Sequence, residues 1–239
     1  MPDPPARWAG HREKRNHLLE LLSPHDWSSL EPLLERVELS ASETVESPGE
    51  VSPWLHFPEA SIISVVNTLA DGRRVAVGTV GNEGMCGLPA WYEARADESH
   101  AVCSSAGPAL RGRASDIIAV AAHRPAIRRL LNRYAAAYIT LVEQGNACNR
   151  IHGLEQRCAR SLLMTQDRLP HNPLQLTSDG LAVMLGVPRA GATLAIRSLR
   201  EHGLIRSSRQ QVDIVDRAGL EQVSCECYRV VRDHFARLA

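Results

Sequence analysis

Four hydrogen-bond donors recur at helical spacing in the last quarter of the chain, at Arg189, Thr193, Arg197 and Arg200. Steps of four, four and three residues place such side chains on one face of a helix. Arginine pairs in a bidentate manner with phosphate oxygens and with the edge of guanine, and threonine also donates to base edges. The stripe therefore predicts contacts with the major groove of DNA. An ordinary helical hairpin with a solvated charged face would show the same spacing. The sequence on either side of the stripe must therefore distinguish a DNA-binding helix from such a hairpin.

Residues 176–203 have the pattern of a helix-turn-helix. Thr177 and Ser178 can cap a first helix, and Gly186 permits a sharp turn after it. We expect the second helix to span about residues 188–202 with the four donors facing outward. The apolar residues that would face inward are Leu181, Ala182, Met184, Leu185, Ala192, Ala195, Ile196 and Leu199. The capping residues, the glycine turn and the inward apolar residues together favour a DNA-reading motif over an ordinary helical hairpin.

Two short β segments follow the second helix, at residues 204–205 and 212–215. A helix-turn-helix followed by such a hairpin is a winged helix, and Arg206 and Arg209 of the hairpin would reach the DNA backbone. The residues that we expect to contact DNA are Thr177, Ser178, Arg189, Ala190, Thr193, Arg197, Arg200, Arg206 and Arg209.

The first part of the chain has the pattern of an antiparallel β-roll, a cupin-like double-stranded helix. Short β-rich runs alternate with turn residues between positions 37 and 115. The runs at 62–66 and 75–80 flank Asp71-Gly72, a strong hairpin signal. Two short helices are expected before the β-roll, at residues 12–22 and 24–34, with Ser23 capping the second. The fold class predicted for the whole chain is α+β.

A long helix is expected from Pro125 to Asn146, between the β-roll and the winged helix. Its apolar residues follow the alternating spacing of a coiled-coil seam, which predicts a dimer interface at Ile127, Leu131, Tyr134, Tyr138 and Leu141. A helix packed on its own domain would show the same spacing. An interruption at 149–153 would be the hinge. The predicted domains are 1–122 for the β-roll sensor, 123–150 for the dimerisation helix and hinge, and 151–239 for the winged helix-turn-helix.

Charge is distributed unevenly along the chain. Residues 1–124 carry 11 basic and 17 acidic side chains, and residues 125–239 carry 16 and 10. The basic second half favours a polyanionic partner such as DNA. No run of about 18 apolar residues and no secretory signal is present, so we expect a soluble cytoplasmic protein with reduced cysteines and no membrane partner.

Motifs of a known family lie at matching positions along the sequence. The motifs are Leu176-Thr177, Met184-Leu185-Gly186-Val187, Arg189, Gly203-Leu204-Ile205, and the stretches 81–85, 148–152 and 225–228. On these residues and the order β-roll, long helix, winged helix, the chain resembles the Crp/Fnr family of bacterial transcription regulators. The resemblance implies a homodimer formed through the long helix, a palindromic DNA operator, contact with RNA polymerase, and a β-roll that senses a small-molecule effector.

The β-roll departs from the cyclic-nucleotide-binding members of that family. In those members a Gly-Glu dipeptide holds the ribose and an Arg-Ser pair holds the phosphate, whereas this chain has Gly87-Leu88-Pro89 and Ser99-His100. Burying a phosphate without a cation is costly, so we expect the signal not to be cyclic AMP unless Arg95, Arg111 or Arg113 folds into the pocket. The residues expected to line the effector pocket are Gly84, Met85, Gly87, Leu88, Ser99 and His100.

Two other functions remain open, a ligand-binding module and a cupin-type metalloprotein, each without DNA binding. A metal centre in a β-roll needs two or three clustered ligands, whereas His56 and His100 are isolated in the sequence. We therefore expect no enzyme, no catalytic residue and no cofactor.

The cysteines indicate a function less clearly than the arginine stripe does. Cys225 and Cys227 are the only closely spaced pair, no second pair at zinc spacing appears, and His234 could serve only as a helper. This set favours a structural role and predicts no metal site, and Cys148 is expected to be a buried apolar residue. A redox or metal role for these cysteines stays an open alternative.

Overall fold

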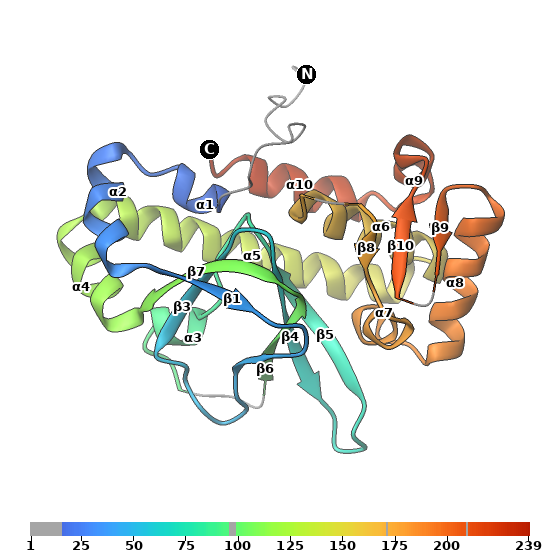
Figure 1. The fold of residues 1–239 in the computed structure, drawn as a ribbon, viewed down its shortest axis with the longest axis horizontal. Helices are drawn as coiled ribbons and strands as arrows, with labels where there is room; N and C mark the ends of the chain where they lie inside the picture. The colour runs from blue at the N-terminus through green and yellow to red at the C-terminus, as the bar shows by residue number, and fades with distance from the viewer. Residues whose placement is uncertain (1–15, 96–98, 171, 209) are drawn as a thin grey trace.

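The computed structural model describes residues 16–95, 99–170, 172–208 and 210–239. Antiparallel sheets form the first part of the chain, a long helix follows, and a small sheet surrounded by helices forms the last part (Figure 1). The predicted α+β class, with the order β-roll, long helix and winged helix-turn-helix, is confirmed.

Two antiparallel sheets form the β-roll, in the orders β1-β7-β3 and β2-β6-β4-β5. The predicted hairpin across Asp71-Gly72 joins β4 to β5, and Gly72 adopts the left-handed φ of +82° that the turn requires. The strands are β1 (Glu35–Leu39), β2 (Thr44–Glu46), β3 (Trp54–Pro58), β4 (Ile62–Thr68), β5 (Arg74–Val80), β6 (Ser99–Ser105) and β7 (Gly107–Arg113).

Two helical segments precede the β-roll as predicted, and residues 12–15 of the first prediction lie outside the described residues. The described part of the first is α1 (His17–Glu20), and the second comprises α2 (Pro24–Leu30) and the 3-10 turn η2 (Glu31–Leu33). Ser23 caps α2 as predicted, since its Oγ accepts a hydrogen bond from the Asp26 amide at 3.1 Å. The α-helix ends before Pro32 because proline has no amide hydrogen to continue it.

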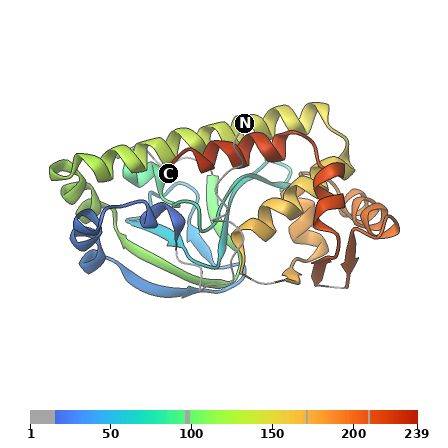
Figure 2. The same cartoon turned by 90° about the horizontal axis from the view of Figure 1, so that it is seen from above.

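The long helix α5 (Pro125–Ile151) has 27 residues, which corresponds to about 40 Å at about 1.5 Å per residue. It follows α4 (Ala114–His123) and runs along the molecule beside α10 (Cys227–Ala236), as Figure 2 shows. The helix continues beyond the predicted end at Asn146, so the interruption is confined to His152 and Gly153. Among the described residues, no single helix is long and apolar enough to span a membrane, and α7 and α8 meet that test only together, as a pair bent by 100°.

The last part of the chain contains a three-stranded sheet of order β8-β10-β9 and the helices that accompany it. Its C-terminal helix α10 leaves this unit and packs along α5, far from it in sequence (Figure 2). The elements are α6 (Leu154–Arg168), β8 (Leu174–Gln175), α7 (Ser178–Leu185), α8 (Arg189–Glu201), β9 (Ile205–Ser207), β10 (Gln211–Ile214) and α9 (Arg217–Val223).

The predicted dimer seam lies inside its own chain. Ile127, Leu131 and Tyr134 are fully buried and Leu141 is nearly so, in a core shared with the β-roll and α10. The Tyr134 hydroxyl donates to the Met85 carbonyl at 2.9 Å. The half-buried Tyr138 packs against the same core. The spacing correctly identified an apolar face, but the assignment of these five residues to a subunit interface is corrected, because elements distant in sequence already cover them.

A buried ion pair joins the two halves of the chain. Arg168, the last residue of α6, lies 2.8 Å from the Glu83 carboxylate of the β-roll, and each side chain is only 7% exposed. Arg168 also donates to Thr79 Oγ1 at 2.9 Å, while Glu83 accepts from the Gly81 amide at 3.2 Å. A Cβ at Gly81 would lie 2.7 Å from the Arg168 side chain, so this close approach requires glycine.

This packing predicts that Arg168→Ala lowers the free energy of unfolding by about 3 to 5 kcal/mol, because Glu83 would keep a buried charge without its partner. Urea unfolding followed by circular dichroism measures the change. The control is Arg73→Ala, which removes the exposed Arg73–Asp71 pair and should change the midpoint little. Equal changes in the free energy of unfolding for the two substitutions would contradict the conclusion that the Arg168–Glu83 pair stabilises the contact between the β-roll and α6.

Candidate nucleic-acid interface

The helix-turn-helix is formed by local signals at residues 177–203. Thr177 caps α7, since its Oγ1 accepts from the Gly180 amide at 3.0 Å. Gly186 ends α7 with a left-handed φ of +63° and thereby turns the chain toward α8. The second helix begins at Arg189, ends at Glu201 and is followed by Gly203 at φ +73°, in agreement with the predicted range of about 188–202.

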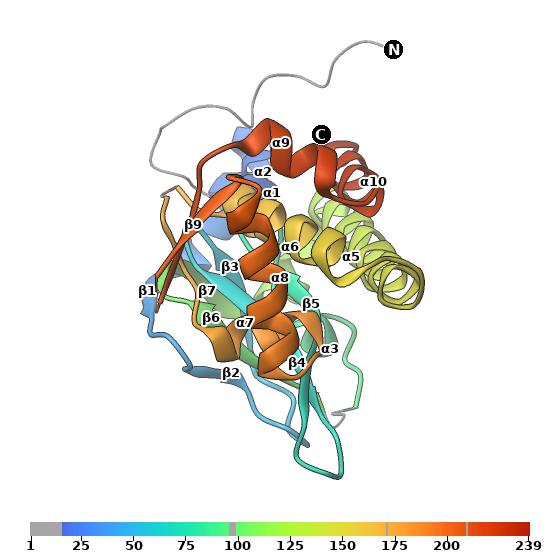
Figure 3. The same cartoon turned by 90° about the vertical axis from the view of Figure 1, so that its right-hand side faces the viewer.

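The two faces of α8 differ as predicted. Ala192, Ala195 and Leu199 are buried, and their small size at two positions lets α8 pack closely on α6 and α7. The opposite face is open and α8 lies at the outer end of the molecule (Figures 1 and 3). The exposed side chains on this face are Arg189, Ala190, Thr193, Leu194, Arg197 and Arg200, and Leu194 is 63% exposed.

Two carboxylates that the sequence reasoning missed pair with the outward arginines. Asp179 of α7 forms an ion pair with Arg189, and Glu201 accepts from Arg197 Nε at 2.7 Å. The hydrogen bond from Arg197 holds the pKa of Glu201 below its ordinary value. The four-residue spacing of Arg197 and Glu201 was a signal for the second pair. Because exposed ion pairs contribute little stability, DNA phosphates can displace these carboxylates.

The wing, defined as β9, β10 and the turn between them, lies beside α8. Arg206 of β9 is exposed and stands opposite Asp213 of β10. Arg209, the other wing residue predicted to contact DNA, lies outside the described residues. A groove lies between α8, the start of α7 and the wing, and its polar lining residues include Thr177, Ser178, Thr193, Arg197, Arg200 and Ser207. The structure thus brings residues from all three predicted elements of the interface together.

The residues predicted to line an effector pocket lie on separate elements. Gly84 and Met85 pack against α5, where a Cβ on Gly84 would lie 2.1 Å from the Tyr134 ring. Gly87, with a left-handed φ of +115°, precedes the helix α3 (Leu88–Trp91) and leaves no room for a Cβ beside Trp54 and Leu55.

The other two predicted pocket residues, Ser99 and His100, begin β6, opposite Asn67 and Val66 of β4. An effector site at these six positions therefore stays a prediction.

The isolated histidines of the β-roll do not gather into a metal centre. His56 is buried on β3, and burial, together with the charge of Arg111, lowers its pKa to about 4. Within the described residues, no group of three or more metal-binding side chains lies in the β-roll. His234, which the sequence offered only as a helper to the C-terminal cysteines, instead places its Nε2 3.4 Å from Thr140 Oγ1. The histidine next to Cys227 is His152.

The fold is that of a β-roll joined to a winged helix-turn-helix whose second helix, α8, has an open arginine face. Residues 156–223 match the family model of the Crp-like helix-turn-helix domain, whereas no curated protein matches the chain. The resemblance to the Crp/Fnr family is confirmed: the DNA-binding domain is Crp-like, and the chain has the fold of these transcription regulators.

Three solved structures illustrate the shared fold. A CRP-family transcriptional regulator from Thermus thermophilus is 23% identical, with a TM-score of 0.65 over 80% of this chain and 96% of that chain. FixK2 from Bradyrhizobium japonicum is 16% identical, with a TM-score of 0.69 over 80% of this chain and 98% of FixK2. The cyclic di-GMP-responsive regulator CLP from Xanthomonas campestris is 15% identical, with a TM-score of 0.63 over 80% of this chain and 99% of CLP.

The position of Arg189 at the start of α8 predicts that Arg189→Ala weakens binding to specific DNA by about 1 to 3 kcal/mol, if the guanidinium pairs with a guanine edge. Fluorescence anisotropy with specific and random-sequence DNA measures both affinities, and the random-sequence affinity should fall less. Arg36→Ala, on the exposed strand β1, is the control and should change neither affinity. An equal loss on both DNAs would identify Arg189 as a phosphate contact instead.

Proposed function

We propose that the protein acts as a homodimer that binds a palindromic operator and places α8 of each subunit in the major groove. The observation that carries this proposal is the exposed stripe of Arg189, Thr193, Arg197 and Arg200 on a helix held in place by α6 and α7. The N-terminal residues of a recognition helix reach the base edges first, so Arg189 and Ala190 would read sequence. Arg200 and Arg206 would contact phosphates on either side.

A gel-shift assay on the DNA upstream of the protein's own gene tests this function. The competitor is unrelated DNA of equal length, at an ionic strength of about 0.15 M, because affinity for phosphate depends steeply on salt. Specific retardation that survives the competitor supports a regulator that binds DNA near its own gene. Equal competition by both DNAs at every salt concentration would favour a ligand-binding module without sequence-specific DNA binding.

The dimer would form through the face of α5 that its own chain leaves open. Ile139 is 55% exposed there, although isoleucine is among the residues most often buried. The exposed residues recur at alternating steps of three and four, the spacing of a helix–helix seam, and comprise Arg129, Asn132, Ala136, Ile139, Glu143, Asn146 and Arg150. Two such helices side by side would place both copies of α8 on one face of the DNA.

This interface predicts opposite outcomes for two neighbouring substitutions. Ile139→Asp should give a folded monomer, because the charge is solvated once the subunits separate. Leu141→Asp should instead lower the melting temperature of the chain itself, because it places a charge in the core. Sedimentation and circular dichroism measure the two effects. A dimer of the Ile139→Asp variant as tight as the wild type would show that the subunits meet elsewhere.

We further propose that the β-roll responds to a signal other than cyclic AMP and that the dimer acts together with RNA polymerase. Of the three arginines that could have replaced the missing phosphate-binding arginine, Arg111 and Arg113 have partners within the β-roll, and Arg95 is exposed. Arg111 pairs with Glu35 at 2.7 Å, and the guanidinium groups of Arg111 and Arg113 lie over the ring of Trp54. The structurally similar regulator CLP is described as responsive to cyclic di-GMP, so a protein of this fold responds to a signal other than cyclic AMP.

These contacts predict that neither cyclic AMP nor cyclic GMP binds with low-micromolar affinity or is needed for DNA binding, since the buried phosphate would lack a cation near Ser99 and His100. Isothermal titration calorimetry of the full chain measures the affinity, and the gel shift without nucleotide measures the requirement. Micromolar binding of either nucleotide, competed by its close analogue, would overturn this interpretation of the pocket.

A further inference from the structure

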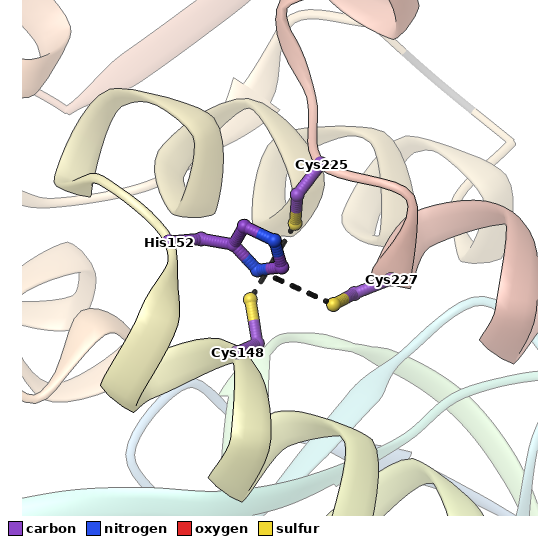
Figure 4. Close-up of side chains that lie close together, drawn as sticks. All are labelled: Cys148, His152, Cys225 and Cys227. Atoms are coloured by element: carbon purple, nitrogen blue, oxygen red, sulfur yellow. Dashed lines mark hydrogen bonds between the residues drawn. The ribbon is translucent and has the colours of Figure 1, made fainter.

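Four side chains with metal-binding atoms converge where α5 ends and α10 begins. Cys148 lies in the last turn of α5, and His152 directly follows that helix. Cys225 precedes α10, and Cys227 is its first residue (Figure 4). Their sulfur and nitrogen ligand atoms all lie within 4.8 Å of one another. The three cysteines are buried free thiols, and His152 is half-buried.

Two of the distances between these atoms match those around one tetrahedral ion. The Cys148 and Cys225 sulfurs are 3.5 Å apart, and Cys227 Sγ is 3.5 Å from His152 Nδ1. Tetrahedral zinc, with Zn–S of about 2.3 Å and Zn–N of about 2.0 Å, separates its ligand atoms by about 3.4 to 3.8 Å. We propose that Cys148, His152, Cys225 and Cys227 bind one Zn²⁺ ion in a closed structural site.

The surroundings of the four ligands support this proposal. His152 directs Nδ1 toward the cysteines, and its Nε2 lies 3.2 Å from the Glu226 carboxylate. A carboxylate on the far nitrogen is the usual arrangement for a zinc-binding histidine, because it fixes the ring and its protonation. Gln144 Nε2 donates to Cys227 Sγ at 3.1 Å, which stabilises a thiolate.

The charges nearby also suit a zinc site. Zn²⁺ with three thiolates and a neutral histidine carries one net negative charge, and Arg160 lies close enough to compensate it. The charge of Arg160 acts on the sulfurs of both Cys148 and Cys225. The Nε atom of Arg160 is buried without a hydrogen-bond partner. A negatively charged centre would therefore give this arginine a counter-charge.

Other chemistry explains less of this arrangement. A Cys148–Cys225 disulfide would need an oxidant to form. It would also not explain why Cys227, His152 and Glu226 lie beside the two sulfurs. A cluster of several iron atoms would hold its thiolates farther apart than these sulfurs lie. Because protein atoms fill all four positions, zinc here would be structural, not catalytic. It would fasten the C-terminal segment, and thus α10, to the end of the long helix.

Metal analysis of untagged protein, purified under reducing conditions without chelator, tests the site. We expect about one zinc per chain in the wild type and in the Cys103→Ser control, whose thiol lies in the β-roll, and less than about 0.2 in Cys225→Ser. Zinc retained by Cys225→Ser at the wild-type level would overturn the proposal. So would a wild type without zinc that carries a Cys148–Cys225 disulfide by mass spectrometry.

A second measurement does not depend on the folding of a variant. Wild-type protein, freed of metal by chelator under reducing conditions, is titrated with Co²⁺. We expect the intense visible absorption of tetrahedral cobalt with thiolate ligands, saturating at one equivalent, bleached by Zn²⁺ and accompanied by a higher melting temperature. Absence of these bands, with an unchanged melting temperature, would overturn the proposal while leaving the DNA-binding function untouched.

Discussion

The buried ion pair between Arg168 and Glu83 connects the β-roll to the DNA-binding part of the chain. Glu83 lies in the turn 81–84, and the same turn holds other elements: Asn16 donates to the Gly84 carbonyl at 2.8 Å, and Tyr134 of α5 packs against Gly84. Asn16, the long helix and α6 therefore meet at one turn of the β-roll. Since α8 packs on α6, its orientation depends on this pair.

A second contact strengthens this dependence. The helix α7 packs on β5, where Val75 lies against Gly186, the glycine that turns the chain into α8. A change in the β-roll that moved β5 or the turn 81–84 would therefore act directly on the recognition helix. At the opposite end of α6, the proposed zinc site would fasten α10 to α5. The position of α8 would thus be determined from both sides, by the β-roll and by the long helix.

Local signals in the sequence were sufficient for the helix-turn-helix, because its caps, its turn and its two faces are encoded within residues 177–203. They were insufficient where distant elements meet. The apolar spacing of α5 identified a buried face, but the sequence did not show that the β-roll and α10 cover it. Similarly, His152 lies four residues after Cys148, a spacing visible in the sequence, yet its closeness to Cys227 arises only from the packing of α10 on α5. The Arg168–Glu83 pair joins residues 85 positions apart and left no local signal.

We propose that two copies of α8, held in position by one dimer, read two halves of a palindrome. Selection of DNA bound by the purified full-length protein from a random-sequence pool tests it most directly. We predict enrichment of an inverted repeat whose half-sites are centred about one helical turn, roughly 34 Å, apart. Enrichment of a single half-site, or of no sequence at all, would contradict it.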